Sequence, residues 1–119
     1  MGNIAISNEI TTLVTVYEVD PAFQQSLVDL LTTAHQQSNV RQPGFISAHV
    51  LRGLDGNRVV GYTQWESRAA AEAALRRDEL WRTFVQIQRI AVADPWFYEV
   101  AFAAFGRVYD TGDEDSGAG

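Results

Sequence analysis

The sequence predicts an α+β fold whose elements follow the order β-α-β-β-α-β. Three observations support this order. Four segments are rich in β-branched or aromatic residues, two segments repeat apolar residues every three or four positions, and a tight turn alone separates the second and third strands. The order is that of ferredoxin-like domains, in which both helices cover one face of a four-stranded antiparallel sheet.

The first strand is predicted over residues 11–19, TTLVTVYEV, and the first helix directly after it. Asp20 and Pro21 suit the N-cap and the first helical position, because aspartate accepts hydrogen bonds from free amides and proline lacks the amide hydrogen that has no partner there. The apolar stripe of this helix comprises Phe23, Leu27, Leu30, Leu31 and Ala34. Pro43 and Gly44 are expected to end the helical region.

A β-hairpin is predicted next, from FISAHVLRG at 45–53 and RVVGYTQWES at 58–67. Asp55 and Gly56 lie between these strands, and this pair readily adopts the positive φ angles of a tight hairpin turn. The two strands should therefore be antiparallel neighbours.

The third strand places a glycine and a tryptophan on one face. Side chains alternate along a strand, so Val59, Gly61, Thr63 and Trp65 point to the same side. A large indole ring thus shares a face with a residue that has no side chain. This pattern predicts either a cavity beside Trp65 or the close approach of a helix, and both readings stay open.

A second helical region in two pieces is predicted after the third strand. Ser67 can cap the first piece, RAAAEAAL, and a break near Arg77 and Asp78 precedes the second piece, ELWRTFVQIQRIAV. The apolar side of the second piece comprises Leu80, Trp81, Phe84, Ile87, Gln88 and Ala91. Asp94 and Pro95 are expected to end it.

The last strand is predicted over 96–109, WFYEVAFAAFGRVY, and both of its faces are apolar. The helices can cover one face, so we expect a second copy to cover the other, sheet against sheet, in a homodimeric α/β barrel. The resulting division is an N-terminal arm at 1–10, one domain at 11–109 and a disordered acidic tail at 110–119.

Composition excludes several classes of protein. The chain has 119 residues, a size typical of one domain, and a formal charge of −6, which disfavours nucleic acid as a partner. It contains no cysteine, so disulfides, iron–sulfur clusters and a cysteine nucleophile are excluded. No apolar run approaches the length of a membrane span and the N-terminus lacks signal-peptide features, so we expect a cytoplasmic protein with no membrane partner.

The stretch QPGFISAHVLRGLDGNRVVGYTQWES and the alanine-rich helix after it resemble the antibiotic biosynthesis monooxygenase family. The recurring features are the PGF entry to the second strand and the WES exit from the third, and the resemblance runs from about Thr11 to Tyr109. The polyketide anthrone oxygenases of that family look most similar, since they share Val59, Val60, Tyr62 and residues 64–67.

The resemblance implies oxygen insertion without flavin, haem or metal. The expected partners are an aromatic polyketide-type phenol or anthrone and molecular oxygen, with the substrate supplying the electrons and a quinone as product. The protein would supply desolvation, orientation and a base.

The family's site residues match this chain in part. The resemblance makes Trp65 a wall of the substrate pocket and aligns an arginine with Arg82. The family's asparagine on the third strand falls on Gly61, and a tyrosine that some members carry falls near Ala71, so both are replaced. The haem-degrading branch is disfavoured, because the helix after the third strand has no histidine to bind iron.

The remaining candidates come from the residues themselves. His35 and His49 are candidate proton acceptors, because the pKa of histidine lies near neutrality. Tyr17 and Tyr62 could orient a phenolic substrate or serve as packing. Arg82 lies opposite the apolar stripe of its helix, where a solvated charge is the alternative reading.

Three functions follow, in order of preference. The first is a cofactor-independent monooxygenase of aromatic polyketide metabolism, with Trp65 as wall and His35, His49 or Arg82 as polar partner. The second is an isomerase or cyclase that acts without oxidation on a polyketide-like intermediate. The third is a dimer that binds a small molecule without catalysis.

Overall fold

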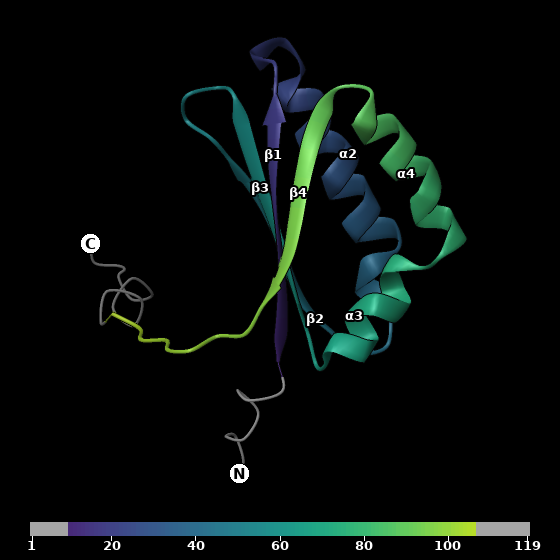
Figure 1. Ribbon diagram of the computed structural model, residues 1–119, viewed down its shortest axis with the longest axis vertical. Helices are drawn as coiled ribbons and strands as arrows, with labels where there is room; N and C mark the ends of the chain where they lie inside the picture. The colour runs from purple at the N-terminus through teal and green to yellow at the C-terminus, as the bar shows by residue number, and fades with distance from the viewer. Residues whose placement is uncertain (1–9, 107–119) are drawn as a thin grey trace, which may run out of the picture.

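The computed structural model describes residues 10–106, which form a four-stranded antiparallel sheet covered by helices (Figure 1). The strands are β1 (Thr11–Val19), β2 (Phe45–Arg52), β3 (Arg58–Trp65) and β4 (Ala91–Tyr98), in the spatial order β2-β3-β1-β4. Each neighbouring pair is antiparallel. This arrangement confirms the predicted ferredoxin-like fold.

The helical elements all lie on one side of the sheet (Figure 1). They are the 3₁₀ turns η1 (Pro21–Phe23) and η2 (Asn39–Arg41) and the helices α2 (Gln24–Gln37), α3 (Arg68–Leu75) and α4 (Asp78–Gln88). Both predicted N-caps are present: the Asp20 side chain accepts a hydrogen bond from the Ala22 amide at 2.8 Å, and Ser67 accepts one from Ala70 at 3.1 Å. No helix among residues 10–106 is long and apolar enough to cross a membrane.

Alternate residues of the strands form the core beneath the helices. Pairing opposes Thr15 to Gly61 and Tyr17 to Val59 across β1 and β3, so these side chains share the helix-facing side of the sheet. One buried cluster comprises Tyr17, Val19, Leu27, Leu31, Val59 and Ile87, and a second comprises Trp65, Ala71 and Ala74. The sheet and helices thereby bury Trp65 at one end of the core.

Gly44 explains the PGF entry to the second strand. Its φ angle is +83°, a conformation that favours glycine. A Cβ atom at this position would lie 2.6 Å from Cβ of Ala70, and the Gly44 carbonyl accepts a hydrogen bond from the Glu66 amide at 2.8 Å. The missing side chain therefore lets the start of β2 pack against α3 directly beside Trp65.

The C-terminal half of the prediction requires a correction. Helix α4 ends at Gln88, and β4 begins at Ala91 and runs through Asp94 and Pro95, which the sequence analysis took as a helix terminator. Proline is tolerated here because β4 is an edge strand, so the absence of an amide hydrogen breaks no ladder on its free side. The predicted apolar side of α4 is also wrong at Trp81, whose side chain is 66% exposed.

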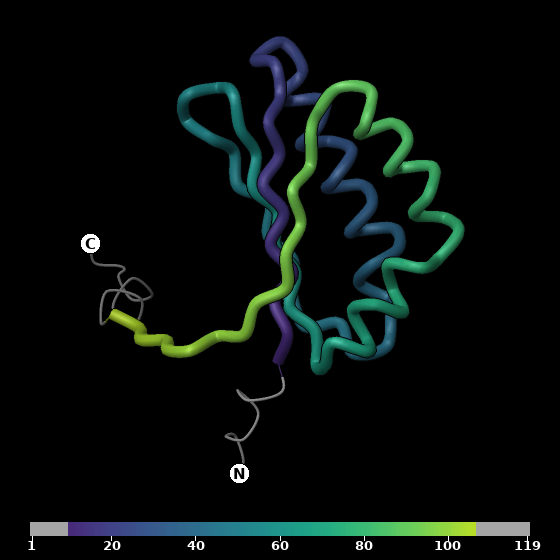
Figure 2. Tube along the Cα trace, viewed as in Figure 1, coloured from purple at the N-terminus to yellow at the C-terminus, as the bar shows by residue number. Residues whose placement is uncertain are grey.

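Residues 99–106 continue beyond β4 without forming a strand and extend away from the body (Figure 2). Phe102 and Phe105 are 84% and 85% exposed in this segment. The predicted last strand therefore ends at Tyr98 within the described residues. Residues 1–9 of the predicted arm and the whole predicted acidic tail lie outside them.

We predict that Gly44→Ala lowers the free energy of unfolding by roughly 1–3 kcal/mol, because the new side chain forces a strained φ angle and a clash with Ala70. Urea denaturation monitored by circular dichroism measures this loss. Gly106→Ala is the control, because a Cβ there would meet no atom within 4 Å. Equal stability of the two variants would contradict the account.

Candidate functional site

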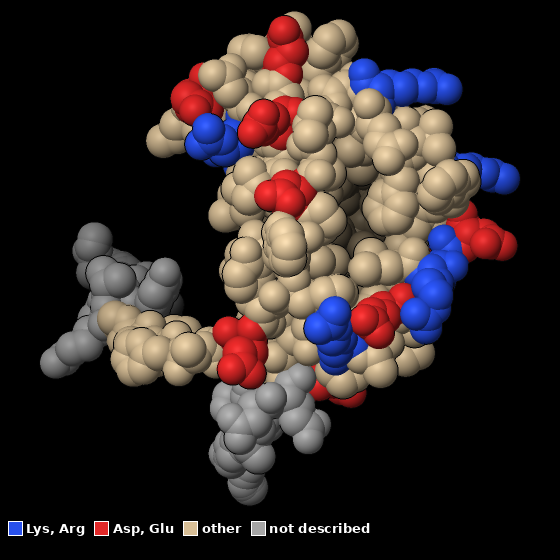
Figure 3. Space-filling view, in the orientation of Figure 1, with Lys and Arg blue, Asp and Glu red and all other residues tan. Residues whose placement is uncertain are grey.

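A cavity of about 410 Å³ lies between the sheet and the helices. Its apolar wall includes Leu13, Leu31, Trp65, Leu80, Phe84 and Ile87. Its polar groups come from Thr15, Tyr17, His35, Asn39, Thr63, Thr83 and Gln88. Figure 3 shows a hollow in the surface between β4 and α4. A mainly apolar space with a few polar groups is typical of a small-molecule site.

Gly61 forms part of the sheet-side wall of this cavity. A Cβ atom at Gly61 would have Cε2 of Tyr17 as its nearest neighbour, at 3.7 Å, and the His49 carbonyl oxygen at 4.0 Å. Both are ordinary contact distances, and both neighbours belong to adjacent strands rather than to a helix. No neighbour therefore approaches so closely that it requires a glycine, and a longer side chain at this position would extend along the cavity wall.

Trp65 is a flat apolar wall whose polar atom is already engaged. The side chain is 3% exposed, and its Nε1–H donates a hydrogen bond to Oγ1 of Thr63 at 2.8 Å. The ring of Phe45 meets the indole edge to face, with centroids 5.4 Å apart and planes at 81°. These contacts fix the orientation of the indole, which forms part of the apolar wall of the cavity.

Tyr17 lies beside Gly61 and stays neutral. Burial raises the pKa of Tyr17 to about 12, although a hydrogen bond with Thr15 opposes the shift. A phenol with this pKa remains protonated throughout the neutral range. Tyr17 can therefore donate a hydrogen bond within the cavity but cannot serve there as a base.

His35 is paired with Asn39, which the sequence analysis missed. Nδ2 of Asn39 lies 2.8 Å from Nδ1 of His35, and both residues line the cavity. Burial lowers the pKa of His35 below its ordinary value of 6.5, so the ring is neutral at pH 7. The spacing of four residues could have indicated the contact, but Asn39 falls in a stretch without apolar periodicity.

The end of α2 is tied to the junction of α3 and α4 by a buried serine. Ser38 Oγ accepts a hydrogen bond from Arg77 Nη1 at 2.7 Å and donates one to Glu79 Oε2 at 2.6 Å, and Arg77 forms an ion pair with Glu79. Ser38 directly precedes Asn39, so this cluster also holds the chain that carries Asn39 in place.

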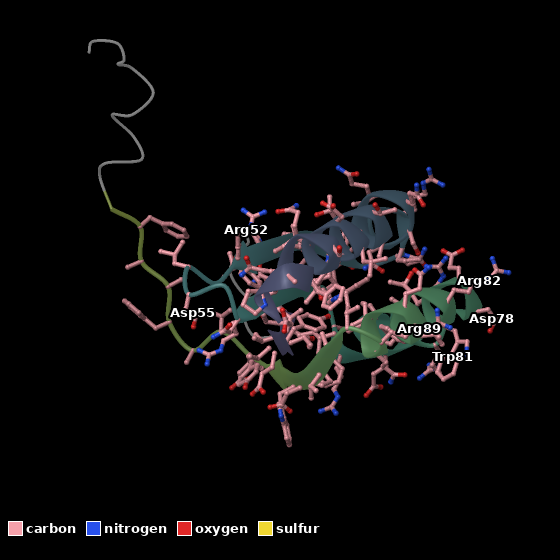
Figure 4. All side chains as sticks on the ribbon, turned by 90° about the horizontal axis from the view of Figure 1, so that it is seen from above. Arg52, Asp55, Asp78, Trp81, Arg82 and Arg89 are labelled. Carbon is pink, nitrogen blue, oxygen red and sulfur yellow. The ribbon has the colours of Figure 1, made fainter. Side chains whose placement is uncertain are left out.

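The structure does not bring His49 or Arg82 to the cavity. The His49 and Tyr62 rings stack at a centroid distance of 4.4 Å and an interplanar angle of 19°. Tyr62 alternates with the cavity residues of β3, and His49 is its partner across the ladder, so this stack lies on the sheet face away from the helices, although Tyr62 borders the cavity along β3. Arg82 projects from the outer side of α4 near Trp81 (Figure 4).

A ferredoxin-like sheet with an apolar cavity beneath its helices defines a small α+β protein with a candidate small-molecule site. The model of the family described as antibiotic biosynthesis monooxygenase matches residues 10–86, so the chain belongs to this family. Tetracenomycin-F1 monooxygenase of Streptomyces glaucescens is 33% identical over 112 residues, which cover 94% of this chain and 99% of the relative.

Solved structures share the fold. A monooxygenase from the gene ActVA-Orf6 of Streptomyces coelicolor, in complex with nanaomycin D, is 26% identical with a TM-score of 0.73 and matches over 88% of this chain and 99% of its own. SnoaB, a cofactor-independent oxygenase from Streptomyces nogalater, is 20% identical with a TM-score of 0.69 over 82% of this chain and 99% of its own. The latter similarity concerns the fold alone.

We predict that Gly61→Leu weakens the binding of a planar anthraquinone by about tenfold or more, because the new side chain fills the space that the ligand needs and a loss of about 1.4 kcal/mol suffices for that factor. Quenching of tryptophan fluorescence measures the binding. Ala73→Leu adds the same side chain at an exposed position of α3 and serves as the control. Unchanged binding by the Gly61 variant would place the ligand elsewhere.

Proposed function

We propose that this protein is a cofactor-independent monooxygenase that oxidises a polycyclic aromatic polyketide-type phenol or anthrone to a quinone. The observation that carries the proposal is the mainly apolar cavity of about 410 Å³, which Trp65 and Gly61 line and which suits an aromatic guest. Membership of the monooxygenase family and the 33% identity to a tetracenomycin-F1 monooxygenase support the same reaction class.

The proposed reaction draws its electrons from the substrate. The anthrone loses a proton, and the resulting carbanion passes one electron to molecular oxygen. The carbon radical and superoxide then combine, and protonation gives a hydroperoxide. Loss of water from this hydroperoxide leaves a carbonyl, so that one CH₂ group and one O₂ molecule become one C=O group and one H₂O molecule.

The protein supplies position and environment in this proposal. The apolar walls exclude water, which strengthens hydrogen bonds to the anion and protects the peroxide. Trp65 is the fixed wall against which the substrate rings lie, since its N–H group is bound to Thr63. His35 and Tyr17 are the polar partners within the cavity, and both are neutral near pH 7.

Oxygen uptake with 1,8-dihydroxyanthrone tests the function. We expect the protein to consume dissolved oxygen above the spontaneous rate, with one quinone formed for each O₂ consumed, because oxygen is a reactant in this function and not in the isomerase, cyclase or binding alternatives. The Gly61→Leu variant should lose most of this rate, and Ala73→Leu should keep it. Conversion of the substrate without oxygen uptake would favour the isomerase or cyclase, and stabilisation by the ligand without turnover would favour a binding protein.

A homodimer is the second part of the proposal. The sheet face away from the helices carries apolar side chains that no described residue covers, among them Leu51, Val92, Trp96 and Tyr98, with exposed fractions of 49% to 69%. Phe102 and Phe105 are further exposed apolar side chains, and they lie in residues 99–106 beyond the sheet. An apolar sheet face of this kind suits a self-complementary contact with a second copy.

We predict that Trp96→Glu shifts the protein from dimer to monomer, because the variant replaces an exposed aromatic side chain of the apolar face with a charge. Light scattering after size-exclusion chromatography measures the mass. Trp81→Glu is the matched control, since Trp81 is similarly exposed, at 66% against 62%, but lies on the outer side of α4. A monomeric wild-type protein, or dissociation by the Trp81 variant alone, would contradict the proposed interface.

A further inference from the structure

The pairing of His35 with Asn39 determines which nitrogen of the imidazole carries a proton. His35 lies in the last turn of α2 and Asn39 begins η2 one turn later, with an exposed fraction of 8%. The nitrogen of the Asn39 amide, at 2.8 Å from Nδ1 of His35, can only donate a hydrogen bond. With the amide in this orientation, Nδ1 is the acceptor, and the single proton of the neutral ring belongs to Nε2.

This tautomer makes His35 a hydrogen-bond donor. With Nδ1 engaged by Asn39, Nε2–H is the group that the ring can offer to a molecule in the cavity. The described residues give Nε2 no hydrogen-bond partner. None of their fully buried side-chain nitrogen or oxygen atoms lacks a partner, so Nε2 is not fully buried, and His35 lines the cavity. A second proton at Nδ1 would point at the N–H group of the Asn39 amide, so that two hydrogen-bond donors would face each other. This repulsion disfavours the use of His35 as a base.

We propose that Asn39 is a positioning residue that holds His35 in the Nε2–H tautomer, and that His35 donates this hydrogen bond to the anionic oxygen of a bound phenolate or enolate. The inference rests on the proposed function for the identity of the ligand. It changes the role of His35 from the expected proton acceptor to a donor that stabilises the deprotonated substrate.

The apolar surroundings give this single hydrogen bond its strength. Negative charge on the deprotonated anthrone resides mainly on its oxygen, and a fixed donor in a water-poor cavity stabilises such charge far better than one in water. The substrate proton itself passes to solvent at the hollow between β4 and α4 (Figure 3). Because His35 does not take up this proton, it stays neutral while the substrate anion reacts with oxygen.

Two measurements test the proposal without any turnover. Nitrogen-15 NMR of histidine-labelled protein reports the tautomer directly, and the chain contains only His35 and His49, so His49→Phe completes the assignment. The second measurement is the colour change on ionisation of bound 2-hydroxyanthraquinone, whose phenol and phenolate forms absorb differently. It gives the ionisation constant of the bound phenol.

We expect neutral His35 to carry its proton on Nε2, and Asn39→Asp to move it to Nδ1 because a carboxylate accepts from that nitrogen. We expect the wild-type protein to raise the ionisation constant of the bound phenol about tenfold relative to a His35→Phe variant that still binds the probe. Asn39→Leu should reduce this increase in the ionisation constant several-fold, and His49→Phe should leave the increase unchanged. His35→Gln restores a hydrogen-bond donor, so recovery of the raised ionisation constant in this variant would support the donor role of His35.

A wild-type His35 with its proton on Nδ1, or a His35→Phe variant with an unchanged ionisation constant, overturns the inference. These outcomes are distinct from failure of the proposed function. A wild-type protein that shifts the phenol ionisation but consumes no oxygen leaves the inference standing and removes the oxygenase. Oxygen consumption with no effect of His35→Phe on ionisation removes the inference alone, and failure of the probe to bind overturns both.

Discussion

The alternation of side chains along β3 is the constraint on which the cavity depends. It directs Gly61, Thr63 and Trp65 together toward the helices, so that empty space, a hydroxyl group and a flat ring follow one another along one wall. Thr63 accepts the indole hydrogen bond and thereby fixes the ring that a ligand would contact. A shift of register by one residue would move all three to the opposite face and eliminate the site.

The polar groups within the cavity share one property, which is that they are neutral. Burial raises the pKa of Tyr17 and lowers that of His35, so both side chains can donate hydrogen bonds without carrying a charge. A substrate that becomes an anion and then gives an electron to oxygen benefits from donors of this kind, since they stabilise the anion without trapping it in an ion pair. The environment thus suits chemistry in which the substrate is the reductant.

Local signals in the sequence predicted most of the fold. The caps at Asp20 and Ser67 depend on contacts within a few residues, and the structure confirms them together with the positive φ angle of Gly56. The positive φ angle expected of Asp55 is wrong, because among the described residues only glycines have positive φ angles. Pro95 misled the prediction, because whether a proline ends a helix or sits in an edge strand depends on sheet order. The pairing of His35 with Asn39 was missed for a similar reason: η2 takes its place from the contacts of Ser38 with Arg77 and Glu79, about 40 residues away.

The most direct test of the central claim is a crystal structure of the protein with a polycyclic quinone. We predict that the quinone lies in the cavity with its rings stacked on Trp65, its edge above Gly61 and one oxygen within hydrogen-bond distance of His35 Nε2. A ligand bound on the open face of the sheet, or a cavity filled by the protein's own side chains with the quinone excluded, would contradict the account.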